Sequence, residues 1–192
     1  MNIFGYYRIM ILGNNGSGKS FLAGELAAIT GLPPVHLDVE FWRPNWEQPS
    51  PAEWLQRQTE LIAKEKWIID GNHTGTMELR FQAADLIIFL DINRWACLAG
   101  VLKRHGKKRA DMPQYLEERL DREFLRFLKG LWNFSKTRKR AILGFHDQYP
   151  DKPFLVIQSR REMNRLIRQW RAEKAEHDIR VYGGAFDRDQ IM

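Results

Sequence analysis

Cysteine and long hydrophobic runs are both scarce in this sequence. Cys97 is the only cysteine among 192 residues, so no disulfide can form within the chain. It lies in the apolar run WACLAGVL, which predicts a buried structural thiol. The most apolar segment, LIIFL at residues 86–90, is too short to cross a bilayer, and residues 1–12 lack the features of a signal peptide. We therefore expect a reduced, cytoplasmic protein with no membrane partner.

The sequence has only a modest excess of positive charge. Its 30 lysines and arginines against 24 acidic residues give a formal net charge of +6. This charge fits nucleotides, nucleic acid or simply a basic soluble surface, and it does not choose among them. Hydrophobic residues make up 44% of the chain, which is enough for a sizeable core. We expect one domain spanning residues 1–192.

Short apolar runs alternate with helical patterns along the chain. This alternation is typical of a parallel β-sheet covered by helices on both faces. A helix is predicted after Ser50, because Pro51 and Glu53 complete a capping box with that serine. Residues 92–149 are expected to form an insertion of two or three helices. The predicted strands are residues 8–12, 35–38, 67–70, 86–91 and 154–158.

Residues 13–20, GNNGSGKS, match the full phosphate-binding pattern GxxxxGK[ST]. In this pattern, glycines let backbone amides turn toward phosphate oxygens at the start of a helix. The chain supplies that context, with an apolar strand before the loop and a helical pattern after it. We expect Lys19 to reach the β and γ phosphates of ATP, and the Ser20 hydroxyl to bind Mg²⁺. The predicted donor site comprises Gly13, Asn14, Asn15, Gly16, Ser17, Gly18, Lys19, Ser20 and Phe21.

Several features that often accompany such a loop are absent. Phe21 stands where many of these loops have a threonine, so a hydroxyl contact to the α phosphate is not expected. Neither the DxxG nor the NKxD string of GTPases occurs. Asp91 is followed by Ile92, so the second acid with which motor, transporter and unwinding ATPases polarise water is missing. These absences favour a small-molecule kinase, in which an acceptor group is the nucleophile.

Three aspartates follow predicted strands. Asp38, Asp70 and Asp91 end the second, third and fourth strands, so they are expected at the sheet edge that carries the phosphate loop. Phosphoryl transfer needs one acid near Mg²⁺ and can use another to orient an acceptor hydroxyl. Asp38 and Asp70 are the candidates for these roles, and helix capping or turn formation is the alternative for all three. The histidines show no metal-ligand spacing.

An aromatic and basic segment follows the second strand. An acceptor with a ring or a phosphate could stack on Trp42 and pair with Arg43. The alternative is that Trp42 and Trp46 only pack the following helix against the sheet.

Basic residues elsewhere could act on phosphate groups. In residues 103–113, Arg104 and Arg109 are the candidate clamps of a mobile lid that would neutralise charge during transfer, and a solvated basic loop is the alternative. Arg80 and Arg94 lie just before and after the fourth strand. A second basic stretch, residues 131–143, could contact nucleic acid, but its pattern favours an amphipathic core helix with a wet basic face. Its cations are Lys136, Arg138, Lys139 and Arg140.

A series of more specific motifs accompanies the phosphate loop. Between residue 8 and about residue 170 the chain contains GNNGSGKS, HLD with W-x-P-x-W, WIIDGN, AADLIIFLD, NRW and SRRE. Together they resemble the DNA topology modulation proteins, which are relatives of adenylate kinase. The resemblance implies ATP binding and an α/β, three-layer P-loop NTPase fold of the nucleoside-monophosphate-kinase type. Its parallel five-stranded sheet would have the order 2-3-1-4-5, with a helical lid insertion.

The resemblance also implies roles for single residues. Asp70 with Gly71 is similar to the Asp-Gly pair of adenylate kinases, in which the acid supports Mg²⁺ through water. Arg80 corresponds to an arginine directed at substrate phosphate. Asp38 is similar to the acid that contacts the acceptor hydroxyl in shikimate-type kinases. The chain continues with Asn72-His73 in place of the Phe-Pro-Arg of adenylate kinases, so AMP is not implied as the acceptor.

The main hypothesis is a kinase-like enzyme that moves the γ-phosphoryl group of Mg-ATP to a small acceptor, which is a nucleoside, a nucleotide or a hydroxy metabolite. One alternative is a nucleotide-sensing regulator that affects DNA topology by binding nucleic acid. Another is a protein that binds ATP without turnover. The sequence leaves the acceptor and the oligomeric state open.

Overall fold

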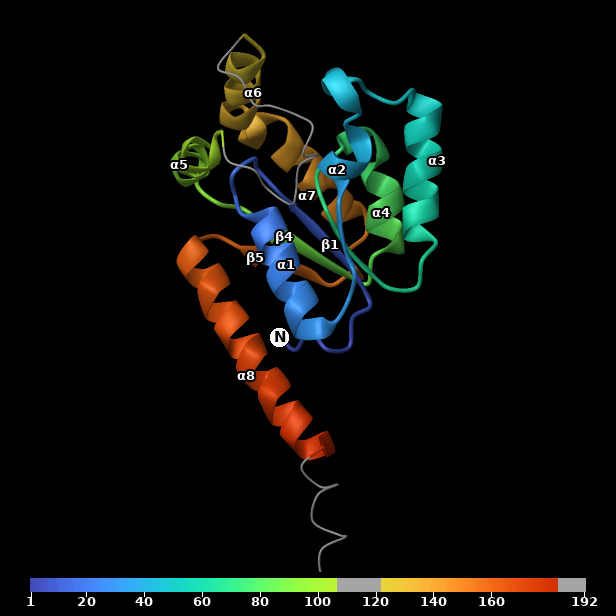
Figure 1. Ribbon diagram of the computed structural model, residues 1–192, viewed down its shortest axis with the longest axis vertical. Helices are drawn as coiled ribbons and strands as arrows, with labels where there is room; N and C mark the ends of the chain where they lie inside the picture. The colour runs from blue at the N-terminus through green and yellow to red at the C-terminus, as the bar shows by residue number, and fades with distance from the viewer. Residues whose placement is uncertain (107–121, 183–192) are drawn as a thin grey trace, which may run out of the picture.

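Five parallel strands form the centre of the protein (Figure 1). The computed structural model describes residues 1–106 and 122–182. Within them the strand order is β2-β3-β1-β4-β5, and every neighbouring pair is parallel. This confirms the predicted sheet order. The strands are β1 Arg8–Gly13, β2 Pro34–His36, β3 Trp67–Asp70, β4 Leu86–Leu90 and β5 Phe154–Ile157.

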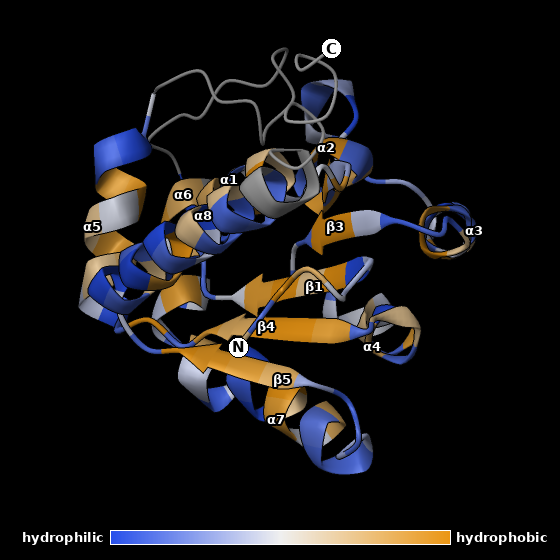
Figure 2. Cartoon of the chain, turned by 90° about the horizontal axis from the view of Figure 1, so that it is seen from below, coloured by the Kyte–Doolittle hydropathy of each residue, from blue (hydrophilic) through white to orange (hydrophobic). Residues whose placement is uncertain are grey.

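Helices cover both faces of the sheet (Figure 2). The α-helices are α1 Lys19–Thr30, α2 Leu37–Phe41, α3 Pro51–Ile62, α4 Met77–Ala83, α5 Arg94–Arg104, α6 Arg122–Trp132, α7 Arg138–Gln148 and α8 Arg160–Tyr182. Three short 3₁₀ turns are η1 Pro44–Trp46, η2 Thr74–Thr76 and η3 Phe134–Lys136. Among the residues described, no helix combines the length and the apolar character that a membrane span requires.

The helical insertion predicted at residues 92–149 contains α5, α6 and α7. The basic stretch that follows Leu131 does not form one helix, because η3 separates the end of α6 from the start of α7. Leu131 and Ile142 are buried on either side of this break. Arg109 lies outside the described residues, so its predicted clamp role stays a prediction.

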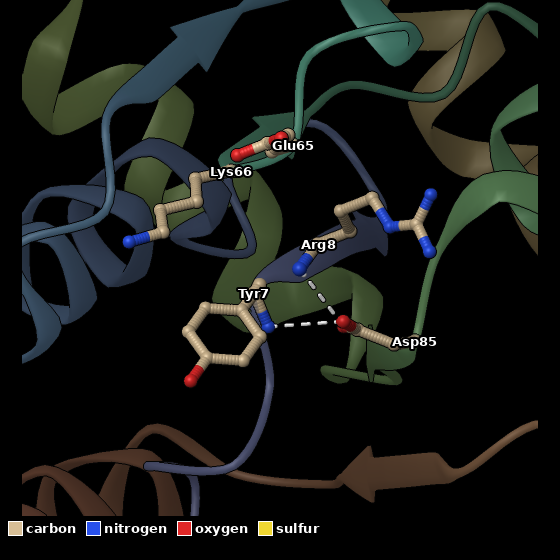
Figure 3. Close-up of a pocket in the computed structure, with 5 residues that line it drawn as sticks. All are labelled: Tyr7, Arg8, Glu65, Lys66 and Asp85. Atoms are coloured by element: carbon tan, nitrogen blue, oxygen red, sulfur yellow. Dashed lines mark hydrogen bonds between the residues drawn. The ribbon is translucent and has the colours of Figure 1, made fainter.

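A cavity of about 450 Å³ lies at the amino ends of three strands (Figure 3). The Asp85 carboxylate accepts hydrogen bonds from the backbone N–H groups of Tyr7 and Arg8, both at 2.9 Å. Glu65 and Lys66, just before β3, complete the lining. Ligands of open parallel sheets bind at the opposite edge, where the strands end. The functional site is therefore expected at the edge formed by the carboxyl ends of the strands.

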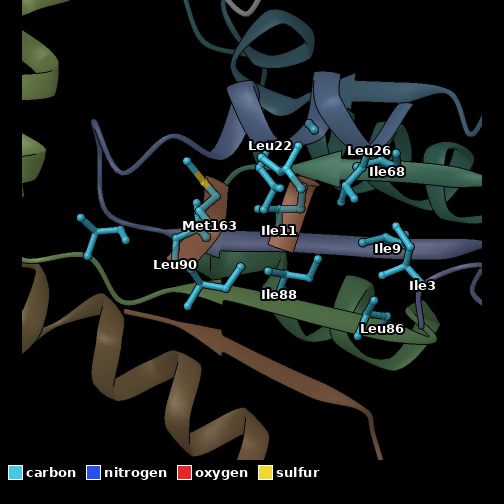
Figure 4. Packing of buried hydrophobic residues seen from close by; sticks show 14 of the residues in the cluster. Ile3, Ile9, Ile11, Leu22, Leu26, Ile68, Leu86, Ile88, Leu90 and Met163 are labelled. Atoms are coloured by element: carbon cyan, nitrogen blue, oxygen red, sulfur yellow. The ribbon is translucent and has the colours of Figure 1, made fainter. Parts of the chain in front are cut away.

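The core consists of two apolar layers, one on each face of the sheet. Successive residues of β1 point to opposite faces, so Ile9 and Ile11 pack in one layer while Met10 and Leu12 pack in the other. The first layer includes side chains of α1 and α8, among them Leu22, Leu26 and Met163 (Figure 4). The second includes Trp54 of α3 and Phe81 of α4. Burial on both faces explains why the strands are almost continuously apolar.

The second strand is shorter than predicted. β2 ends at His36, and residues 37–41 form the short helix α2. The buried Leu37 anchors this helix in the core, and Asp38 and Glu40 lie in its first turn, where carboxylates interact favourably with the helix dipole. Asp38 therefore lies on a helix beyond the sheet edge, and the prediction that it ends the strand is wrong.

The capping box of α3 is present as predicted. The Ser50 Oγ accepts a hydrogen bond from the Glu53 backbone N–H at 3.3 Å, and the Glu53 carboxylate accepts one from the Ser50 N–H at 2.7 Å. Arg43 donates to the same carboxylate at 2.9 Å. The hydrogen bond from Arg43, together with those from Ser50, lowers the pKa of Glu53 to about 2. Glu53 is thus engaged both by its own helix and by Arg43.

We predict that Ser50→Ala lowers the free energy of unfolding by about 1 kcal/mol, because it removes the acceptor for a backbone N–H at the start of α3. Urea denaturation monitored by circular dichroism measures this change. Ser50→Thr is the control and should retain most of the stability, since threonine also caps helices. Equal midpoints for the wild type and the alanine variant would contradict the prediction.

Candidate active site

The phosphate loop joins β1 to α1 through three glycines with positive φ angles. These angles are 150° at Gly13, 77° at Gly16 and 103° at Gly18, which L side chains rarely adopt. A Cβ atom on Gly16 would lie 2.2 Å from the Cys97 carbonyl oxygen, and one on Gly13 would lie 2.7 Å from the Leu90 carbonyl oxygen. The loop therefore requires glycine both for its backbone conformation and for its close packing.

Lys19 folds back over this loop. Its Nζ donates to the carbonyl oxygens of Gly13 and Asn14, each at 3.1 Å. Burial lowers the pKa of Lys19, while the negative charges of Asp70 and Asp38 act in the opposite direction. The ammonium group thus lies within electrostatic reach of both predicted acids.

Side chains from other parts of the chain hold the loop. The Asn72 side-chain amide accepts from the Gly13 N–H at 3.1 Å and donates to the Gly13 carbonyl at 2.8 Å. The Asn14 side chain donates to the Leu131 carbonyl at 2.9 Å. Arg160, at the start of α8, donates to the Gly16 carbonyl at 2.9 Å. The sequence did not predict that Asn72 and Arg160 hold the loop. The two residues stand out in the sequence only as members of the motifs WIIDGN and SRRE.

Ser20 and Asp70 lie together, as a magnesium site requires. The Ser20 Oγ is 3.5 Å from the Asp70 Oδ1. The other carboxylate oxygen of Asp70 lies 2.6 Å from His36 Nδ1, a contact that the sequence did not indicate. No group of three or more His, Cys, Asp or Glu side chains within residues 1–106 and 122–182 could hold a metal ion. One hydroxyl and one carboxylate fit Mg²⁺, which retains waters and uses substrate phosphates as further ligands.

Asp38 approaches the loop from α2. Its Oδ1 lies 3.3 Å from His73 Nε2, which belongs to the segment after β3. The Asp38 side chain is 53% exposed, but the chain around it removes part of its solvent, and this desolvation acts to raise its pKa. The hydrogen bond from His73 and the positive charges of Lys19 and Arg104 outweigh this effect and hold the pKa below its ordinary value. The Asp38 carboxylate is therefore ionised at neutral pH.

Arg80 does not occupy the place that the sequence predicted. Its side chain is fully buried, and its guanidinium donates to the backbone carbonyls of Gly71 at 2.8 Å, Asn72 at 2.5 Å and His73 at 3.1 Å. Burial lowers the pKa of Arg80 to about 9, so the group stays protonated at neutral pH. A side chain enclosed in this way holds the loop after β3 and does not reach a substrate phosphate. The prediction that Arg80 contacts a substrate phosphate is therefore wrong.

The predicted basic residues after β4 lie in different surroundings. Arg104 ends α5, and its charge lowers the pKa values of both Lys19 and Asp38, which agrees with a position facing the loop. Arg94 instead lies over the Trp132 ring, with its guanidinium carbon 4.3 Å from the ring centre. This cation–π contact directs Arg94 toward α6, so the structure does not bring it to the loop.

Asp91 does not join the acidic group near Lys19. Its carboxylate forms an ion pair with Lys139 of α7 at 2.6 Å. The pair links the end of β4 to α7, so Asp91 has a structural role. Lys139 is one of the cations proposed for nucleic-acid binding, and this ion pair already engages it.

The aromatic segment after α2 forms a connected group of rings. Trp42 meets Phe41 and Trp46 edge to face, with centroid distances of 5.0 and 5.4 Å. Trp46 remains exposed, whereas Trp54 is the tryptophan that packs α3 into the core. Arg43 is hydrogen-bonded to Glu53, so the predicted contact of Arg43 with an acceptor would have to compete with this bond.

Comparison with known proteins supports the fold. No protein-family model matches the sequence, and a search of curated proteins finds no match. Among solved structures, a shikimate kinase from Acinetobacter baumannii in complex with shikimate has a TM-score of 0.53 and 12% identity, covering 96% of this chain and 97% of that chain. A gluconokinase from Sinorhizobium meliloti 1021 has a TM-score of 0.49 and 13% identity, with coverages of 93% and 97%. A deoxyadenosine kinase from M. mycoides has the same score and identity, with coverages of 86% and 98%.

The chain has a kinase-like P-loop fold. The sheet order β2-β3-β1-β4-β5 is that of the nucleoside-monophosphate-kinase type, and the shikimate kinase matches it over nearly the full length of both chains. At 12% identity this likeness shows the fold alone.

We predict opposite effects for two Gly→Ala substitutions that lie eight residues apart. Gly16→Ala should lower the free energy of unfolding by about 1–3 kcal/mol, because alanine strains the loop and clashes with the Cys97 carbonyl. Gly24→Ala should raise it by about 0.5–1 kcal/mol, because Gly24 lies inside α1 with open space around it. Urea denaturation of both variants tests the pair. Equal effects would show that the loop does not need its glycine.

We also predict that Arg80→Met lowers the free energy of unfolding by about 2–4 kcal/mol, because it leaves the buried carbonyl groups of Gly71 and Asn72 without the donor that Arg80 supplies. Arg57→Met is the matched control. Arg57 pairs with Glu40 and Glu60 at the surface, and its loss should change stability by about 1 kcal/mol or less. Chemical denaturation measures both changes, and similar losses for the two variants would refute the assigned role of Arg80.

Proposed function

We propose that this chain is a cytoplasmic kinase that transfers the γ-phosphoryl group of Mg-ATP to the hydroxyl group of a small acceptor. The observation that carries this proposal is the position of Asp38. Its ionised carboxylate lies outside the phosphate loop but within electrostatic reach of the Lys19 ammonium group. A carboxylate within electrostatic reach of the phosphate-binding lysine can receive a hydroxyl group that attacks the γ phosphate.

The donor side is assigned to the loop and its neighbours. Backbone amides of residues 13–20 would hold the phosphates at the start of α1, and Lys19 would neutralise charge on the β and γ phosphates. Ser20 and Asp70 would hold Mg²⁺, Asp70 through water. The metal would supply further positive charge to the phosphate oxygens when bound. Arg104, with Arg109 from the proposed lid, would stabilise charge on the transferring group.

The acceptor side is assigned to Asp38. The acceptor hydroxyl would donate its hydrogen bond to this carboxylate, which orients the oxygen toward the γ phosphorus. A bond forms between that oxygen and phosphorus while the bond from phosphorus to the ADP oxygen breaks. The hydroxyl proton passes to Asp38 and then to solvent. Direct transfer to water is less favoured, because Ile92 follows Asp91 where a water-polarising acid would stand.

The charges around the acceptor side favour an acceptor without a phosphate group. Within residues 34–83, Arg43 is bonded to Glu53, Arg57 to Glu40 and Glu60, and Arg80 to backbone carbonyls. An acceptor phosphate that bound to one of these three arginines would have to displace its partner. Nucleosides and other hydroxy metabolites are therefore favoured over nucleotides, and Trp42 is the ring on which such an acceptor could stack.

We predict that ADP forms from Mg-ATP only when a suitable acceptor is present, and that Lys19→Met abolishes this activity. The assay follows ADP release with a panel of nucleosides, their monophosphates, sugars and polyols. Lys174→Met is the control, because Lys174 lies on α8 and contacts the Ala28 carbonyl, away from the proposed chemistry. ATP hydrolysis that is equally fast without any acceptor would contradict the proposal.

A second candidate function is nucleotide-dependent regulation of DNA topology. It rests on the sequence resemblance to DNA topology modulation proteins and on the exposure of Lys136 and Arg140, near Arg138. The ion pair between Lys139 and Asp91 weakens it, because this lysine is already neutralised. Binding to duplex DNA across a salt series, with and without ATP, separates the two functions. Nucleotide-sensitive binding at physiological salt would favour the regulator, whereas binding that fades with salt reflects only the net charge.

A further inference from the structure

His73 has an unusual backbone conformation. Its φ of 33° and ψ of 69° lie in the left-handed region, which residues other than glycine seldom occupy. In the part of the chain that the structure describes, Asn45 and Trp46 are the other non-glycine residues with positive φ, and both lie in the aromatic segment after α2. Such conformations persist where surrounding contacts enforce them, and they gather at functional sites.

Contacts on two sides enforce the conformation of His73. Its carbonyl oxygen accepts hydrogen bonds from the buried Arg80 at 3.1 Å and from the Thr76 N–H at 3.0 Å. Its ring packs against both Phe41 and Trp54, with centroid distances of 4.7 and 4.9 Å. Only 16% of the side chain is exposed. Both the backbone and the ring are thus held firmly, which is a condition for a side chain that must orient another group.

The held ring of His73 presents one nitrogen to Asp38. Nε2 lies 3.3 Å from the Asp38 Oδ1, and because Asp38 is ionised, Nε2 carries the proton and donates it. The other charges that act on Asp38 are those of Lys19 and Arg104. Without His73, the exposed carboxylate could turn toward the Lys19 ammonium and compete with phosphate for it.

We propose that His73 is a positioning residue for phosphoryl transfer: its Nε2–H group holds one oxygen of Asp38, so that the other oxygen can receive the acceptor hydroxyl. The proposal rests on the kinase function proposed above. It adds a residue that acts through Asp38 and that neither the phosphate loop nor the magnesium site includes. Loss of such positioning lowers the rate, because the hydroxyl is then poorly aligned with the phosphorus.

Two substitutions at position 73 separate positioning from backbone strain. Asparagine tolerates positive φ angles well, but its amide is too short to reach Asp38. Glutamine can bring an amide N–H close to the place of Nε2, although it fits the backbone less well. His73→Gln should therefore retain most of the activity, whereas His73→Asn should lower kcat by about tenfold to a hundredfold with the KM for ATP unchanged.

A readout without turnover completes the test. Carbon-13 NMR of the Asp38 carboxyl during a pH titration should show a higher pKa in His73→Asn than in the wild type, because a hydrogen bond to the charged form is lost. In His73→Gln the value should stay close to that of the wild type. Thermal denaturation checks that both variants are folded.

The outcomes are distinct. Activity and Asp38 pKa values that are preserved in His73→Gln and altered in His73→Asn support the proposal. Equal behaviour of the two variants, or better function in His73→Asn, overturns it, because backbone strain would then be the only role of His73. If no acceptor activates the wild type, the kinase function fails. The titration then still decides whether His73 holds Asp38.

Discussion

The buried guanidinium of Arg80 is the constraint on which both halves of the site depend. It is a full charge removed from water, and in the described structure its hydrogen-bond partners are the carbonyls of Gly71, Asn72 and His73. Because a buried charge must be satisfied by hydrogen bonds, these carbonyls are held toward it. The side chains of the same segment then point away, Asn72 to Gly13 of the phosphate loop and His73 to Asp38. One buried charge thus connects the phosphate loop with Asp38, the proposed acceptor residue.

Much of the fold could be predicted from the sequence, because its signals are local. The capping box needs only Ser50 and Glu53, and both of its hydrogen bonds form. The phosphate loop is equally local, since its glycines are required by the backbone conformation at their own positions. The sheet order was implied by the resemblance between motifs, and the structure confirms it.

The pairings within the site could not be predicted in the same way. His36 and Asp70 are 34 residues apart, and His73 and Asp38 are 35 residues apart, so no spacing rule connects them. The phosphate role of Arg80 came from the family resemblance, and the backbone carbonyls that Arg80 binds instead leave no trace in a sequence. The end of β2 at His36 was also missed, because the alternation of apolar and polar residues in VHLDVEF is typical of a strand and gives no sign that a helix begins at Leu37.

The phosphate loop also packs closely against α5. A Cβ atom on Gly16 would meet the Cys97 carbonyl, and one on Gly100 would lie 2.6 Å from the Gly16 carbonyl and 2.3 Å from the Arg160 guanidinium. The helix therefore packs on the loop through backbone contacts that leave no room for a side chain. Because α5 ends in Arg104, a movement of this helix relative to the loop would move the Arg104 charge as well. The position of Arg104 is thus set by the same close packing that demands glycine in the loop.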